Sequence, residues 1–82
     1  MTSPEDALAQ AERQVREGEV RVTRQAGLLR QLQADGDWRA AAMAKRFLAL
    51  QEKRLADAEE HLRKVRVATD AARQAAPSDQ TN

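Results

Sequence analysis

His61, the one histidine of the chain, and Asp57 one helical turn before it are the residues best suited to bind a metal. An imidazole and a carboxylate at this spacing share one face of a helix, but a metal site needs three or four converging ligands. The Glu-x-x-His pair of di-iron bundles is also absent, because Ala58 stands where its Glu would be. We therefore interpret His61 as an exposed helical side chain and predict no metal.

The residue pattern does not indicate any other common kind of enzyme active site either. The chain has no cysteine, so thiolate catalysis, disulfides and thiolate metal sites are excluded. It also lacks a Ser/His/Asp set and a glycine-rich phosphate loop. We expect no catalytic residue, no cofactor and no enzymatic activity.

Basic side chains gather in the middle of the sequence. Residues 21–54 carry eight basic and three acidic side chains, although the whole chain has a net charge of only +1. Nucleic-acid binding would favour a larger net charge or interleaved aromatic residues, and Trp38 alone is a candidate for stacking. An ordinary solvated surface is the main interpretation, and binding to a nucleic acid or an acidic partner is the alternative function. The basic patch comprises Arg24, Arg30, Arg39, Lys45, Arg46, Lys53 and Arg54.

An apolar stripe formed by Met43, Phe47 and Leu50 is the feature that most suggests a partner. Their i, i+4, i+7 spacing places them on one side of a helix, about a quarter turn from the main apolar seam described below. Leu28 is expected to face Phe47 from the preceding helix. We predict that these four residues form the interface of a homodimer. The alternative is that they widen the seam and pack within one chain.

The composition is that of a long-helix protein. Alanine supplies half of the hydrophobic residues in the 82-residue chain, and a third of all residues are charged. No apolar run is long enough for a membrane span, and the first residues do not resemble a secretory signal. These observations, with the lack of cysteine, favour a cytoplasmic protein that does not enter a membrane.

One strong break divides the chain, at residues 34–38. Gly36 can adopt the left-handed conformation that ends a helix, and the Asp37 carboxylate can accept the free N–H groups that begin the next one. A turn this short places two helices side by side and antiparallel. The alternative is a glycine bulge in one continuous rod, which would be unstable alone in water.

Heptad repeats, labelled a to g with apolar residues at a and d, run through both halves. They predict one helical hairpin over residues 1–76, with helices at about 4–34 and 38–75, a turn at 35–37 and a disordered tail at 77–82. The first half has Leu8, Val15, Val22 and Leu29 at a, and Ala11, Gly18, Gln25 and Leu32 at d. The second half has Ala41, Leu48, Leu55 and Leu62 at a, and Ala44, Gln51, Ala58 and Val65 at d.

The short turn also predicts the register, because facing residue numbers should add to 73. Most layers then pair a large side chain with a small one, and Gly18 lies opposite Leu55, which needs the room. Gln25 and Gln51 fall in neighbouring layers. Two interpretations of them stay open, one with their amides hydrogen-bonded across the seam and one with both side chains reaching solvent.

Several stretches resemble a group of short uncharacterised proteins of alphaproteobacteria. The resemblance covers about residues 10–65, and it implies a free-standing bacterial protein that folds as a hairpin, with no assigned activity. After the turn the chain departs from the group, since Asp37-Trp38 replaces a more usual His-Asp-Thr. The matching stretches are Gln14-Val15-Arg16-Glu17-Gly18-Glu19, Arg24-Gln25, the Leu28 to Leu32 run, Asp35-Gly36 and Glu59-Glu60-His61.

Together these patterns predict an all-α protein, a two-helix antiparallel coiled-coil hairpin that dimerises into a four-helix bundle. Its expected function is that of a non-enzymatic, self-associating interaction or scaffolding module, with an unidentified protein partner left open and nucleic acid as the less favoured one. Neither the partner nor the direction in which two hairpins pack follows from the sequence.

Overall fold

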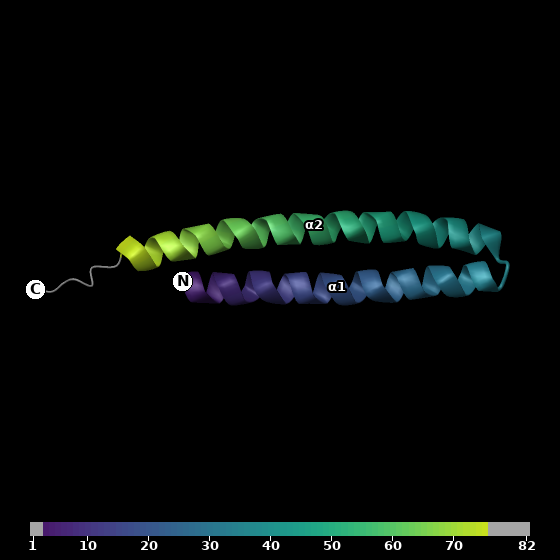
Figure 1. Cartoon of the computed structure of the whole chain (residues 1–82), viewed down its shortest axis with the longest axis horizontal. Helices are drawn as coiled ribbons and strands as arrows, with labels where there is room; N and C mark the ends of the chain where they lie inside the picture. Colours follow the sequence, from purple (N-terminus) through teal and green to yellow (C-terminus); the bar gives the residue numbers. More distant parts are fainter. Residues whose placement is uncertain (1–2, 76–82) are drawn as a thin grey trace, which may run out of the picture.

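The computed structural model describes residues 3–75, which form two helices joined by a tight turn. Helix α1 runs over Pro4–Ala34 and helix α2 over Trp38–Ala75. The two lie side by side and antiparallel along nearly their whole length, and α2 extends past the start of α1 (Figure 1). The predicted all-α hairpin is confirmed. The predicted disordered tail at 77–82 lies outside the described residues.

Helix α1 begins where the sequence supplies a cap. The Ser3 hydroxyl accepts a hydrogen bond from the Asp6 backbone N–H at 3.1 Å, and Pro4 follows as the first helical residue. Proline suits this position because its missing N–H would have no helical partner there. Glu5 and Asp6 in the first turn add negative charge at the positive end of the helix dipole.

The turn closes α1 and opens α2 within three residues. Gly36 has a φ of +77°, the left-handed conformation that glycine adopts without strain. The Asp37 N–H donates to the Leu32 carbonyl at 3.0 Å and the Gly36 N–H to the Gln33 carbonyl at 3.1 Å, which is a Schellman motif. The Asp37 carboxylate then caps α2 by accepting from the Ala40 N–H at 3.2 Å.

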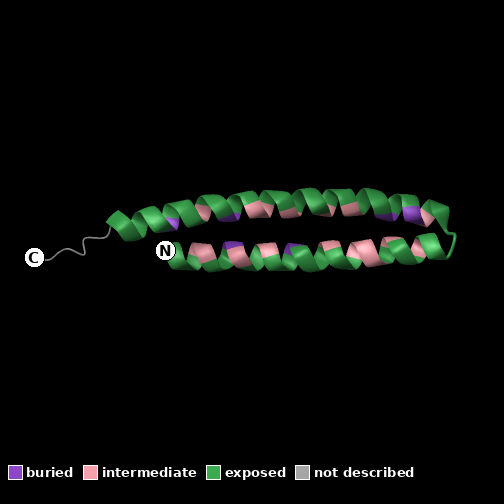
Figure 2. Cartoon of the chain, viewed as in Figure 1, coloured by how far each residue is buried: buried purple, intermediate pink, exposed green. Residues whose placement is uncertain are grey.

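Every a and d position of the two predicted heptads is buried or half-buried, so the seam lies where the sequence placed it (Figure 2). The core is nevertheless thin. Among the described residues, the buried hydrophobic side chains are Ala11, Ala41, Ala44 and Leu62, three of which are alanines. Because alanine buries little apolar area, the seam stabilises the hairpin less than one of larger residues would.

The predicted register is confirmed at two distant layers. A Cβ atom added to Gly18 would lie 3.1 Å from Leu55 Cδ1, so these residues face each other across the seam at close range. Near the open end the Thr69 hydroxyl donates to the Pro4 carbonyl at 3.5 Å. In both pairs the residue numbers add to 73, so the register holds without a slip from the turn to the open end.

Neither of the two interpretations of Gln25 and Gln51 holds as stated. Gln25 does reach across the seam, but its Nε2 donates to the backbone carbonyl of Ala44 at 3.2 Å rather than to the other glutamine. The Oε1 atom of Gln51 is buried, so this oxygen does not reach solvent. It also has no hydrogen-bond partner among the described residues. The seam therefore contains one satisfied amide and one acceptor left unpaired.

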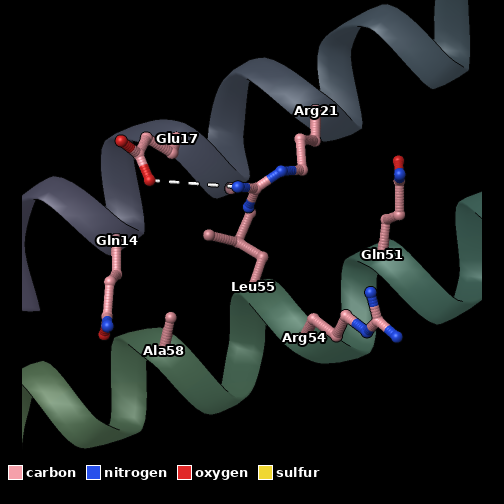
Figure 3. A pocket seen from close by; sticks show the side chains of 8 residues that line it. Gln14, Glu17, Arg21, Gln51, Arg54, Leu55 and Ala58 are labelled. Atoms are coloured by element: carbon pink, nitrogen blue, oxygen red, sulfur yellow. Dashed lines mark ion pairs between the residues drawn. The ribbon is translucent and has the colours of Figure 1, made fainter.

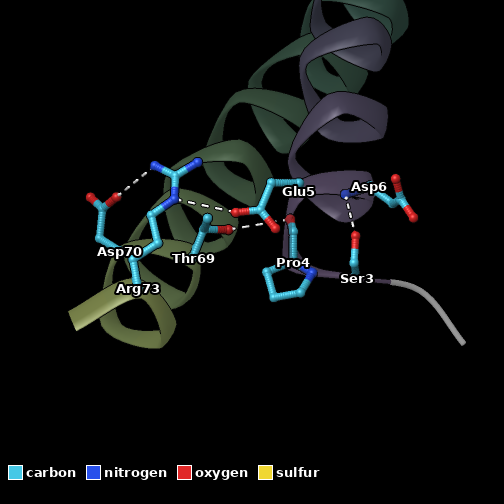
Figure 4. Close-up of polar contacts among 7 residues, drawn as sticks. All are labelled: Ser3, Pro4, Glu5, Asp6, Thr69, Asp70 and Arg73. Carbon is cyan, nitrogen blue, oxygen red and sulfur yellow. Dashed lines mark hydrogen bonds and ion pairs between the residues drawn. The ribbon is translucent and has the colours of Figure 1, made fainter. Parts of the chain in front are cut away.

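Ion pairs hold the open end of the hairpin along one edge (Figure 4). The Arg73 Nε atom lies 3.3 Å from the Glu5 carboxylate, and its Nη1 lies 3.8 Å from Asp70. Further in, Arg66 lies 3.8 Å from Glu12 across the same edge. The two pairs that cross between the helices, Glu5 with Arg73 and Glu12 with Arg66, join residues at heptad position e. Opposite charges therefore face each other along this edge, although such exposed pairs each contribute little.

The close approach at Gly18 makes a testable prediction about the register. We expect Gly18→Leu to lower the free energy of unfolding by about 1–3 kcal/mol, because the larger side chain overpacks the layer that Leu55 fills. Gly27→Ala is the matched control. Its Cβ would meet only the flexible Arg30 side chain, at 3.9 Å. The helix-forming alanine should therefore raise stability by about 0.5–1 kcal/mol.

Chemical denaturation followed by circular dichroism measures both changes at one protein concentration. If Gly18→Leu instead stabilised the protein, as Gly27→Ala is expected to do, that result would contradict the close packing of Gly18 against Leu55.

Candidate functional site

An apolar groove opens along one edge of the hairpin, close to the turn. Its volume is about 560 Å³, and we define it by the side chains of Leu28, Leu32, Met43, Phe47 and Leu50. The structure thus brings all four predicted interface residues to one place, with Leu32 added from the seam. They meet there because Leu28 and Phe47 occupy g positions on the same edge, while Met43 and Leu50 lie beside Phe47 at c.

The apolar groove stays open to solvent. Leu28, Met43, Phe47 and Leu50 keep between 43% and 67% of their surfaces exposed. Packing within one chain, the alternative weighed from the sequence, therefore does not cover them. Four large apolar side chains exposed together, rather than scattered singly, are typical of an interaction surface.

A second cavity follows the apolar groove along the same edge. It encloses about 360 Å³ around Gly18, and we call it the glycine notch (Figure 3). Arg21 and Arg54, both at g positions, lie on its two sides, and Leu55 points from α2 toward α1. Arg21 Nη2 is 3.9 Å from Glu17 Oε1, a loose and exposed ion pair.

The basic patch predicted from the sequence contains Arg54, but the position of Arg54 beside Arg21 at one cavity was not predicted. The signal was present, because in this register residues 21 and 54 both occupy g and therefore flank the seam together. Two like charges at facing g positions are unfavourable in a coiled coil. The glycine notch also contains the buried Gln51 oxygen, which has no hydrogen-bond partner among the described residues.

The structure does not gather the basic patch into one site. All seven of its side chains are exposed, but they line different surfaces. Arg46 borders the apolar groove, Arg54 the glycine notch, and Arg24 a shallow hollow on the outer side of α1. Lys53 donates to Asp57 at 3.1 Å. Because the patch is spread over both helices, it presents no concave basic surface of its own.

His61 and its neighbours form no metal site in the described part of the chain. His61 is exposed, and no group of three His, Cys, Asp or Glu side chains gathers there. Asp57 is engaged by Lys53. A hydrogen bond from Arg63, strengthened by the positive charge of that guanidinium, lowers the pKa of Glu60 below its ordinary value. This pair is exposed, so the lowered pKa reflects a surface ion pair and not a reactive site.

Comparison with models of protein families, with curated proteins and with solved structures finds no match. The resemblance to short alphaproteobacterial proteins therefore stays a prediction. In the described helices, no stretch is both long and apolar enough to cross a membrane.

The dispersed basic patch leads to a second prediction. Reversing Arg39, Lys45 and Arg46 to Glu should change the free energy of unfolding by less than about 1 kcal/mol, because exposed charges contribute little individually. Thermal unfolding measures this directly. We also expect the unmodified protein not to retard DNA or RNA in a gel-shift assay at low salt. Retardation that disappears in the reversed variant would instead establish the basic patch as a nucleic-acid surface.

Proposed function

We propose that the protein is a non-enzymatic interaction module that acts as a homodimer, with the apolar groove as the interface between two copies. The observation that carries this proposal is the exposure of Leu28, Met43, Phe47 and Leu50 around one cavity of about 560 Å³. A second hairpin laid over the apolar groove would complete a four-helix bundle.

The thin core gives an energetic reason for self-association. Ordering each residue costs on the order of 1.5 kcal/mol, and the largest compensating term is buried apolar area. Within one hairpin, the buried hydrophobic residues of the described chain are three alanines and Leu62. Covering the apolar groove would bury four larger side chains, so folding and dimerisation would support each other.

The two edges of the hairpin differ in a way that favours this choice of interface. The e edge carries inter-helix ion pairs, Glu5 with Arg73 and Glu12 with Arg66, which are satisfied within one chain. The g edge instead carries Leu28 and Phe47 near the turn. In coiled coils the e and g positions select the partner, and here the g side offers a cluster of exposed apolar side chains near the turn, whereas the e edge exposes Trp38 alone among the large apolar residues of the described helices.

A charge placed in the apolar groove tests the proposal. Phe47→Glu should give monomers that are largely unfolded at micromolar concentration, because the carboxylate would lose water in the interface. Val67→Glu is the matched control. Val67 lies on the outer side of the same helix and is 70% exposed, so this variant should stay dimeric and folded.

Size-exclusion chromatography with light scattering measures the mass of each variant, and circular dichroism measures its helix content. If the unmodified protein proved to be a stable, folded monomer of about 9.1 kDa, self-association would be excluded. Loss of the dimer in both glutamate variants would contradict the assignment of the apolar groove as the dimer interface.

A further inference from the structure

We propose that the second copy packs antiparallel to the first, so that the turn of each hairpin covers the glycine notch of the other. In this arrangement α1 lies against its copy and α2 against its copy, around a two-fold axis that passes by Leu28. The inference rests on the proposed homodimer and specifies its direction and register, which the apolar groove alone does not determine.

The apolar groove and the glycine notch form one continuous docking edge. Apart from Leu55 at a and Arg46 at f, both are lined from positions c, d and g, so they follow each other on the same side of the hairpin. At 1.5 Å per residue, Leu28 lies about 13 Å from the turn and Arg21 about 23 Å from it. A partner centred on the apolar groove therefore reaches the glycine notch as well.

A parallel dimer would bring four positive charges together. With both turns at the same end, symmetry places α1 of one copy against α2 of the other at equal distance from the turn. Arg21 would then face Arg54 of the partner subunit, and the reciprocal pair would lie beside it. Four guanidinium groups at one level of the bundle repel each other, and the cost rises as water is excluded.

The antiparallel dimer replaces this repulsion with attraction. If Leu28 meets its own copy, facing residue numbers in α1 add to 56, which places Asp35 opposite Arg21 of the partner subunit. Asp35 is exposed at the end of α1, and Gln31 Nε2 donates to its carboxylate at 3.2 Å, so the carboxylate is held on the g edge. Symmetry forms this pair twice.

The apolar contacts fit the same register. Within one hairpin facing residue numbers add to 73, so Leu28 lies level with residue 45 of α2. A two-fold axis that passes by Leu28 therefore also passes by residue 45, and facing residue numbers in the two copies of α2 add to 90. Met43 then faces Phe47 of the partner subunit, and Ala40 faces Leu50 of the partner subunit. Each large exposed side chain of the apolar groove thus gains an apolar neighbour, and Leu50 meets a small one, as close packing requires.

Arg54 also gains a complementary surface. A sum of 90 places it over Gly36 of the partner subunit, beside the Asp37 carboxylate that caps α2. The turn therefore presents two carboxylates, Asp35 and Asp37, to the two arginines of the glycine notch. This complementarity identifies a second copy of this chain, rather than an unrelated helix, as the occupant of the docking edge.

Because the chain contains no cysteine, disulfide crosslinking between introduced cysteines can show in which direction the two copies pack. A disulfide requires Cα atoms within about 7 Å of each other. Leu28→Cys should crosslink to its own copy in the antiparallel dimer. Gln14→Cys is the control, because it has the same heptad position but lies about 42 Å from its copy in that arrangement. We expect Leu28→Cys to oxidise to the dimer at least roughly tenfold faster than the control.

The parallel alternative has its own signature. A mixture of Leu28→Cys and a tagged Phe47→Cys chain would form the mixed disulfide, since α1 would then lie against α2 of the partner subunit. That result, without the Leu28→Cys self-crosslink, would overturn the antiparallel dimer while leaving the proposed homodimer intact. A dimer by light scattering that showed neither crosslink would overturn the inference in the same way, and a monomeric wild type would overturn both.

Charge reversal tests the pairing of Asp35 with Arg21. Asp35→Arg and Arg21→Asp should each weaken the dimer roughly tenfold at low salt, about 1.4 kcal/mol, and the double variant should recover most of the loss. Within one chain the two residues lie about 21 Å apart on the same helix, so rescue can only come from a contact between copies. Additive weakening in the double variant, measured by sedimentation equilibrium, would contradict the pairing.

Discussion

The close approach of two helices at a turn of fixed length is the constraint on which the whole structure depends. Gly36 in its left-handed conformation and the cap at Asp37 fix the length of the turn, and therefore the register of α2 against α1. One register follows for the whole hairpin, and it brings Leu55 against Gly18 and Thr69 against Pro4. The positions of the apolar groove, the glycine notch and the ion-paired edge are all consequences of that register.

Small residues in the seam connect the stability of the hairpin to its surface. Ala11, Gly18, Ala41 and Ala44 let the backbones approach, but they bury little apolar area. Four further large apolar side chains, Leu28, Met43, Phe47 and Leu50, lie at c and g, outside the seam, and stay exposed. A hairpin built in this way is well defined in geometry and weak in core, which is the combination that favours folding together with a partner.

Much of the candidate site was predictable from the sequence. The i, i+4, i+7 spacing of Met43, Phe47 and Leu50 predicted a second stripe, and the register predicted that Leu28 would join it. The glycine notch was not predicted, although its residues were in view. Its open volume and the burial of the Gln51 oxygen without a partner among the described residues emerge only from the structure. These outcomes depend on side-chain rotamers, to which heptad periodicity is insensitive.

The sequence by itself determined the secondary structure, the turn and the register of this protein, because each depends on local signals: capping side chains, a glycine with positive φ, and apolar residues at a and d. Only the tertiary structure decided which large side chains remain uncovered. Exposure depends on what the opposite helix places nearby, as where Arg21 and Arg54 line one cavity at the g edge and Arg66 lies 3.8 Å from Glu12 at the e edge. That difference between the two edges arises from the packing of both helices, so it appears only once they are placed together.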